Sequence, residues 1–247
     1  MARSARTRRL DLALAEAGLA ASTDRAKALI MAGRVRVAGE TVREPGRPVR
    51  GGQALEVAAP PPYVSRGGEK LAPALDRFGV GVRGKVCVDV GASTGGFTDV
   101  LLQRGAERVY AVDVGRGQLA WKLRQDPRVV VMEGVNARDL TPFPESIALA
   151  TVDVSFIGLD KVLPALRQSA PGAELVVLFK PQFQVSREQV ERGGVVRDPA
   201  VVRAAMDAFA AWCGENGFEV MAEMPAAIRG PAGNQEYLLH LRQEGTR

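Results

Sequence analysis

Short apolar runs recur along the C-terminal three quarters of the chain and alternate with amphipathic stretches. The runs are rich in β-branched residues, which is typical of buried strands, whereas apolar residues spaced three or four apart indicate helices. The predicted strands are a run that begins at Val86 and residues 108–114, 129–133, 147–154, 174–179, 218–224 and 235–241. Helical spacing covers residues 70–78, 97–102, 118–125 and 199–214. This alternation predicts an α/β fold with a parallel sheet, closed by an antiparallel hairpin of the last two strands.

The first 57 residues follow a different pattern. Apolar residues at helical spacing predict two short helices, over residues 10–19 and 24–31, and residues 34–37 alternate as a half-buried strand does. Three consecutive prolines from Pro60 form a stiff, extended spacer. We therefore expect an N-terminal domain over residues 1–59, a linker over 60–66 and a second domain over 67–247.

The charge is distributed unevenly between these two parts. The formal net charge is +5, and residues 1–57 hold 11 Lys and Arg against 6 Asp and Glu, whereas the remainder holds 22 of each sign. All the excess positive charge therefore lies in the first quarter. This distribution favours a basic module that meets a polyanion, and it leaves a merely solvated basic face as the alternative.

Several classes of protein are not indicated by the sequence. The chain has two cysteines, Cys87 and Cys213, without the spacing of a metal site, which is typical of core residues in a reducing compartment. No stretch approaches the ~18 consecutive apolar residues of a spanning helix, and the charged N-terminus lacks an apolar signal core. We expect a soluble cytoplasmic protein, favoured to be a monomer, with no membrane partner and no metal ion.

A glycine-rich turn connects the strand at Val86 to the following helix. Its sequence, V-C-V-D-V-G-A-S-T-G-G-F-T, has glycines at positions 91, 95 and 96, with Ser93 where a dinucleotide fingerprint has its second glycine. A pyrophosphate is therefore disfavoured. The spacing instead resembles the first motif of S-adenosylmethionine-dependent methyltransferases. On that resemblance the residues expected to contact S-adenosylmethionine are Asp89, Gly91, Ala92, Ser93, Gly95, Gly96 and Phe97.

Polar residues also stand at the ends of the next strands. Asp113 ends the second strand, at about the spacing at which a carboxylate accepts ribose hydroxyl groups, although an ordinary loop residue is the alternative. Asp153 and Lys180 end the fourth and fifth strands. The carboxyl ends of parallel strands form the ligand crevice of an open α/β sheet, so these side chains are expected to face one site. The resemblance adds Asn136 and Ala137, beside the adenine, with a simple polar turn as the alternative.

The N-terminal region resembles the S-four RNA-binding domain, and G-R-V-R-V-A-G is the most specific part of the match. Thr23 and Ala38 depart from that family, which often has arginine and asparagine there. The resemblance implies contacts to RNA phosphates, which give affinity without reading sequence. The residues expected to make them are Arg6, Arg8, Arg9, Arg25, Lys27, Arg34 and Arg36.

With V-D-V-S-F, K-P-Q-F and N-Q-E-Y also in order, the whole chain resembles the TlyA family, which joins an S-four domain to a methyltransferase domain related to FtsJ. The resemblance implies a Rossmann-like sheet of seven strands and 2′-O-methylation of ribosomal RNA. It also implies a catalytic tetrad at Lys70, Asp153, Lys180 and Glu236. Gln184 departs from the family's K-P-Q-F-E, which concerns an auxiliary acidic role and not the tetrad.

Lysine usage supports this assignment, because only 6 of the 33 basic residues are lysine and two of them fill tetrad positions. Lysine can give up its proton, whereas arginine cannot. Two other classes stay open. One is a membrane-active haemolysin, since the family also carries that name, and the other is an RNA-binding protein that has lost catalysis and would be expected to lose Asp113 or a tetrad member. Residues 184–197 form a long polar loop, for which function or disorder is expected.

Overall fold

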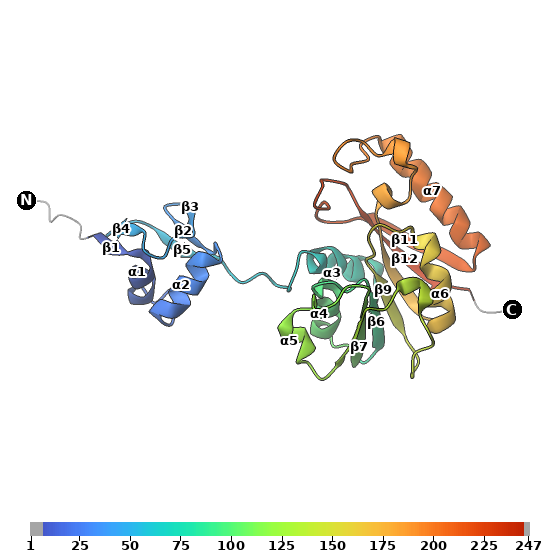
Figure 1. The fold of residues 1–247 in the computed structure, drawn as a ribbon, viewed down its shortest axis with the longest axis horizontal. Helices are drawn as coiled ribbons and strands as arrows, with labels where there is room; N and C mark the ends of the chain where they lie inside the picture. Colours follow the sequence, from blue (N-terminus) through green and yellow to red (C-terminus); the bar gives the residue numbers. More distant parts are fainter. Residues whose placement is uncertain (1–6, 245–247) are drawn as a thin grey trace, which may run out of the picture. The chain divides into compact units, whose positions relative to one another are not determined.

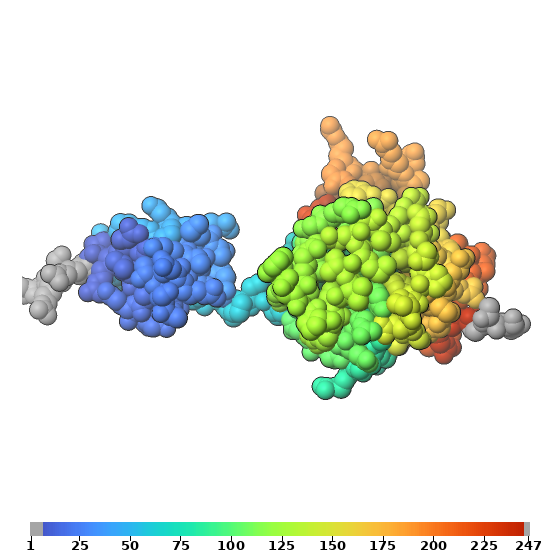
Figure 2. All heavy atoms as spheres, turned by 60° about the horizontal axis from the view of Figure 1, so that its bottom comes forward, coloured from blue at the N-terminus to red at the C-terminus, as the bar shows by residue number. Residues whose placement is uncertain are grey.

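The computed structural model describes residues 7–244 and divides the chain into two units between Pro61 and Pro62. The atoms within each unit are closely packed (Figure 2). Residues 62–66, which the sequence assigns to the linker, belong to the second unit. The N–H of Val64 donates a 2.8 Å hydrogen bond to the carboxylate of Asp99, and Tyr63 packs against the core of that unit.

The first unit is a small α+β domain built around two helices. Its elements are β1 (Thr7–Arg9), α1 (Leu10–Glu16), α2 (Thr23–Met31), β2 (Val35–Val37), β3 (Glu40–Val42), β4 (Pro48–Arg50) and β5 (Leu55–Val57). Strands β3, β2 and β5 form one antiparallel sheet, and β1 pairs with β4. The alternation along β2 buries Val35 and Val37 against the helices and leaves Arg36 exposed. The predicted helices and strand are present, and the first helix ends earlier than expected.

The second unit is an open sheet of seven strands with helices on both faces (Figure 1). Its helices are α3 (Gly67–Phe78), α4 (Gly96–Gln103), α5 (Trp121–Arg124), α6 (Leu163–Ser169) and α7 (Pro199–Glu215). Its strands are β6 (Val86–Val90), β7 (Arg108–Asp113), β8 (Val129–Glu133), β9 (Leu149–Val152), β10 (Glu174–Phe179), β11 (Phe218–Pro225) and β12 (Tyr237–Gln243). Four short 3-10 helices occur in its loops, η1 (Ala137–Asp139), η2 (Leu159–Lys161), η3 (Pro181–Phe183) and η4 (Arg187–Gln189).

The strand order is β11-β12-β10-β9-β6-β7-β8. Strand β12 is antiparallel to its two neighbours, β11 and β10, and all the other neighbouring pairs are parallel. The predicted α/β fold with a seven-stranded sheet and a closing hairpin is confirmed. From β6 the chain proceeds to β7 on one side and later to β9 on the other. The gap between the ends of β6 and β9 is therefore the point where ligands bind in such sheets.

The central strands send side chains alternately to two apolar cores. Val88 and Val90 of β6 belong to the core under α6 and α7, whereas Cys87 faces α3 and α4. Burial on both faces explains why these strands read as continuous apolar runs. Both cysteines are buried and unbonded, and burial raises the pKa of each thiol to about 12, so they serve as apolar core residues.

Two segments differ from the sequence expectation. Helix α5 begins only at Trp121, because the N–H groups of Gly117 and Gln118 donate to the carboxylate of Glu133 instead of entering a helix. The loop over residues 184–197 is ordered, with η4 and a bridge between Glu191 and Val195.

Candidate active site

The glycine-rich turn lies where the ends of β6 and β9 approach each other. Gly91 has a φ of +86°, and a Cβ at this position would collide with the backbone oxygen of Asp153. Only glycine combines this backbone conformation with so close an approach. The sequence of the turn thereby places Asp153 directly beside it.

Asp113 holds the same turn from the end of β7. Its carboxylate accepts hydrogen bonds from the N–H groups of Ser93 and Gly115, both at 2.7 Å. It also faces a cavity of about 430 Å³, which we call the smaller cavity. Asn136 and Ala137 line this cavity as well, and the Asn136 side chain caps η1 by accepting the N–H of Arg138 at 3.1 Å.

The other predicted turn residues divide into two groups. Ala92, Ser93, Gly96 and Phe97 line a second cavity of about 850 Å³, the larger cavity. Gly95 lines neither cavity, and its φ of +95° instead lets the chain enter α4 close to the side chain of Leu123. Its requirement for glycine is therefore conformational.

Asp89 corrects the sequence expectation, because its side chain does not reach either cavity. It is completely buried beneath the turn, where its two carboxylate oxygens accept hydrogen bonds from Thr98 at 2.6 Å and Thr151 at 3.0 Å. Burial raises the pKa of Asp89 to about 7, although the two threonine hydroxyl groups oppose this shift. Its contacts join α4 to β9 beneath the turn, so its role is to support the site.

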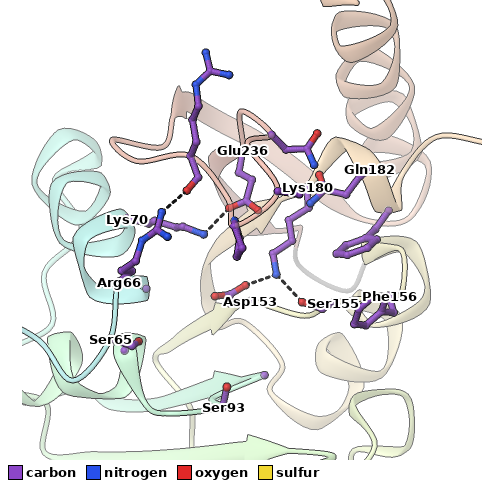
Figure 3. A pocket seen from close by; sticks show the side chains of 18 of the residues that line it. Ser65, Arg66, Lys70, Ser93, Asp153, Ser155, Phe156, Lys180, Gln182 and Glu236 are labelled. Atoms are coloured by element: carbon purple, nitrogen blue, oxygen red, sulfur yellow. Dashed lines mark hydrogen bonds and ion pairs between the residues drawn. The ribbon is translucent and has the colours of Figure 1, made fainter. Parts of the chain in front are cut away.

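The four predicted catalytic residues converge on the larger cavity from four parts of the chain (Figure 3). Lys70 of α3 pairs with Glu236, just before β12, with 2.5 Å between Nζ and Oε2. Lys180, just after β10, lies 2.6 Å from Oδ1 of Asp153 and donates a 2.9 Å hydrogen bond to the hydroxyl of Ser155. The four residues predicted to share one site do so, and they form two ion pairs.

These ion pairs are largely removed from water. Lys70 and Lys180 are each 7% exposed, and Glu236 is 1% exposed. Such charges are stable only when paired, since the loss of one partner from a buried pair costs about 3–5 kcal/mol. Each lysine has its own carboxylate partner, which holds its Nζ atom in a fixed position.

The two cavities adjoin at the turn. Both are lined by Gly91, Ser93, Asp153, Ser155 and Phe156. A ligand in the smaller cavity and a ligand in the larger one therefore meet beside Asp153. The arrangement suits the transfer of a group from one bound molecule to another.

Ser155 and Phe156 were not predicted from the sequence. Ser155 fixes the Lys180 ammonium group, as described above. Phe156 is 92% exposed although it lines both cavities, has a left-handed φ of +63°, and its ring lies 5.2 Å from that of Phe183. A strained, exposed aromatic residue beside a site is a signal of function, but the strain shows only in the structure.

In the first unit, several predicted RNA-binding residues have carboxylate partners. Arg8 pairs with Glu16 and Lys27 pairs with Asp24. Arg9 pairs with the buried carboxylate of Asp11 at 2.8 Å, and the guanidinium lowers the pKa of Asp11. The charge of Arg9 is therefore used to anchor the start of α1.

The remaining basic residues of the first unit are oriented differently. The Arg34 guanidinium donates to the backbone oxygen of Ala58 at 3.2 Å. Arg25 and Arg36 are exposed and make no ion pair with any residue of the range 7–244. Arg6 lies outside the described residues. Among the predicted residues, Arg25 and Arg36 are thus the best placed to meet a phosphate.

Neither a metal site nor a membrane span is present in the part of the chain that the structure describes. No group of three or more His, Cys, Asp and Glu side chains between residues 7 and 244 is arranged to hold a metal ion. No helix within the same range is both long and apolar enough to cross a membrane.

Comparison with known proteins finds a matching family for each of the two units. The FtsJ-like methyltransferase family matches residues 63–243, and the S4 domain family matches residues 8–55. The chain is 47% identical to the 16S/23S rRNA (cytidine-2'-O)-methyltransferase TlyA of Mycobacterium tuberculosis, over 98% of this chain and 92% of that protein. It is 40% identical to Hemolysin A of Brachyspira hyodysenteriae, over 94% and 98% of the two chains.

A solved structure from Streptococcus thermophilus, described as a candidate hemolysin, superimposes with a TM-score of 0.75 at 42% identity and covers 97% of this chain and 90% of its own. The sequence matches and this structure thus extend over both units. The chain belongs to the TlyA family, in which an S4 domain precedes an FtsJ-like methyltransferase domain.

Proposed function

We infer that the protein transfers a methyl group from S-adenosylmethionine to a ribose 2′-hydroxyl group of ribosomal RNA. The observation that carries this inference is the convergence of Lys70, Asp153, Lys180 and Glu236 on a cavity that adjoins the one beside Asp113. The Mycobacterium tuberculosis relative is named for the same reaction on cytidine. A membrane-active function gains no comparable support from a described residue. A protein that had lost catalysis would be expected to lose Asp113 or a tetrad member, and all of these residues are present.

The smaller cavity fits the nucleoside part of S-adenosylmethionine. Asp113 offers a carboxylate for ribose hydroxyl groups, and the backbone of residues 91–93 approaches without side-chain bulk at Gly91. Asn136 and Ala137 also line this cavity, and the adenine is proposed to lie beside them. When bound, this cofactor supplies a methyl group on a positively charged sulfur.

The residues of the larger cavity would prepare the RNA. The hydroxyl of a ribose becomes a better nucleophile as its proton is withdrawn. Lys180, in its neutral amine form, is the side chain proposed to accept that proton at Nζ and so to become the ammonium ion. Asp153 and Ser155 hold this nitrogen in place from two sides. Lys70, fixed by Glu236, provides a second positive charge beside the developing oxyanion.

Single-stranded RNA suits the mouth of this cavity. The exposed ring of Phe156, backed by Phe183, offers a flat surface of the kind on which unstacked bases lie. The S4 domain adds an RNA-binding unit outside the catalytic domain. We propose that this unit supplies phosphate contacts and that the catalytic cavity receives a single nucleotide.

The experiment is to incubate the protein with separated ribosomal subunits and labelled S-adenosylmethionine and to map the label. We expect Lys180→Arg to bind the cofactor and RNA nearly normally but to methylate at least about a hundredfold more slowly, because arginine keeps the charge and cannot give up its proton. Lys161→Arg, at an exposed ion pair with Asp160, is the matched control. A Lys180→Arg variant with the wild-type rate would exclude Lys180 as the base.

A further inference from the structure

Asn234 is a buried polar residue that neither the tetrad nor the proposed cofactor site explains. It lies in the loop between β11 and β12, two residues before Glu236, and it is 1% exposed. A buried amide is stable only when its donor and acceptor are both satisfied. Its partners therefore indicate what it holds in place.

Both ends of the Asn234 amide bind the loop between η4 and α7. The Oδ1 atom accepts the N–H of Val196 at 2.9 Å, and the Nδ2 group donates to the backbone oxygen of Gly194 at 2.7 Å. One side chain thus connects segments that are about 40 residues apart in sequence. The two hydrogen bonds restrict both the position and the orientation of the loop.

This loop forms part of the wall of the larger cavity. Val190, Gly193 and Gly194 line the cavity, and residues 229–236 continue the same wall through Arg229, Pro231, Ala232, Asn234 and Glu236. We call these cavity-lining residues together the two-loop wall. None of its members borders the smaller cavity. The two-loop wall therefore faces the side of the site assigned to RNA, not the nucleoside part of the cofactor.

The second half of the wall also supports Glu236. A Cβ at Gly230 would collide with the carboxylate of Glu236, and the N–H of Gly230 donates to the backbone oxygen of Asn234 at 3.0 Å. The turn over residues 230–234 thus packs directly against a tetrad side chain. Asn234 lies at the junction of this turn with the 190–197 loop.

We propose that Asn234 is a positioning residue for the target nucleotide, which it serves by fixing the 190–197 loop as a rigid side of the RNA cavity. The proposal rests on the proposed function, because it assigns the larger cavity to RNA. A preformed wall spares the substrate the cost of ordering a loop when it binds. Loss of the amide therefore weakens RNA binding more than it slows methyl transfer.

The test compares Asn234→Ala with the wild-type protein in four measurements. We expect the KM for ribosomal RNA to rise about tenfold, with kcat within about twofold, since the tetrad pairs remain. The Kd for S-adenosylmethionine is expected not to change. Hydrogen exchange of the Val196 amide is expected to become at least about tenfold faster, because its acceptor is removed.

Two further variants guard against a purely structural effect. Gln235→Ala is the matched control, because the Gln235 amide binds the backbone oxygens of Ala226 and Glu236 in the same hairpin but lies outside the larger cavity. Glu191→Ala breaks only the exposed ion pair with Arg197 at the base of the loop, so it keeps the fold. We expect an unchanged KM in the first variant and a smaller rise in KM in the second.

An unchanged KM in Asn234→Ala, or an equal rise in Gln235→Ala, would overturn the proposal. So would a weaker affinity for S-adenosylmethionine, which would place the wall on the cofactor side. If Asn234→Ala fails to fold, Glu191→Ala replaces it in the test. An unchanged KM for RNA or a weaker affinity for S-adenosylmethionine in Glu191→Ala would then overturn the proposal. If the wild-type protein does not methylate ribosomal RNA, the proposed function fails. The Kd for RNA and the exchange rate of the Val196 amide, each compared between Asn234→Ala and wild type, then decide whether Asn234 positions the loop for RNA.

Discussion

Replacing the buried carboxylate of Asp89 with an amide is expected to make the protein more stable at neutral and alkaline pH. Burial raises the pKa of Asp89 to about 7 from its ordinary 3.8. Between these values the unfolded chain has released the proton and the folded chain still binds it, so the free energy of unfolding falls as pH rises through this window. Above pH 7 both states are ionised and the loss is complete.

The size of this effect follows from the two pKa values. A difference of about 3 pKa units at 1.36 kcal/mol per unit corresponds to up to about 4 kcal/mol. Asp89→Asn has nearly the same shape and never ionises, and its amide can still bond with Thr98 and Thr151. We expect the variant to match the wild type within about 1 kcal/mol at pH 4 and to exceed its free energy of unfolding by up to about 4 kcal/mol at pH 8.

Denaturant titrations of both proteins between pH 4 and pH 8 measure this difference directly. The exposed carboxylate of Asp139, replaced in the same way, is the control. Parallel pH profiles for wild type and Asp89→Asn would refute the reasoning. They would mean that the threonine hydroxyl groups fully compensate the burial of the charge.

Three further outcomes are expected. Asp113→Ala is expected to weaken S-adenosylmethionine binding at least about tenfold in calorimetry, because it removes a charged acceptor worth about 1.5–3 kcal/mol and frees the N–H groups of Ser93 and Gly115; an unchanged affinity would exclude the assignment. Gly91→Ala is expected to lower the free energy of unfolding by more than about 1–2 kcal/mol, since it combines a left-handed backbone with a collision at Asp153; equal denaturation midpoints would contradict this. Removal of residues 1–61 is expected to weaken RNA binding and reduce its salt dependence, by about 0.9 in log–log slope for each duplex phosphate that is no longer neutralised, while cofactor affinity is retained; an unchanged slope would make the basic unit a solvated surface only.

Much of the second unit follows from local sequence. Strands β8 and β10 have the bounds that their apolar runs predict. For β10 the reason is that a strand buried on both faces leaves a continuous apolar signal. Lys180 and Asp153 could be assigned to one site because they follow parallel strands, whose ends meet at one edge of the sheet. Lysine in a chain that favours arginine was an independent indication.

The residues that the sequence analysis misassigned or missed each have a physical reason. Asp89 lies within β6 and not at its end, so the pleat directs its side chain against α4 and away from the ligand crevice. The roles of Ser155 and Asn234 depend on partners about 25 and 40 residues away, which no local pattern contains. The ion pair of Arg9 with Asp11 could not be predicted either, because a short polar sequence does not show which charged side chains become buried.

The wide separation of the tetrad in the sequence has a consequence for synthesis. Glu236 is 166 residues from its partner Lys70, whereas the N-terminal unit is completed by contacts within its first 61 residues. Local contacts form early and distant ones late, so a growing chain gains the S4 unit long before the last strand closes the catalytic cluster. A chain whose synthesis stops after the S4 unit and before β12 is therefore expected to bind RNA without methylating it. Such incomplete chains would compete with the finished enzyme for its own substrate.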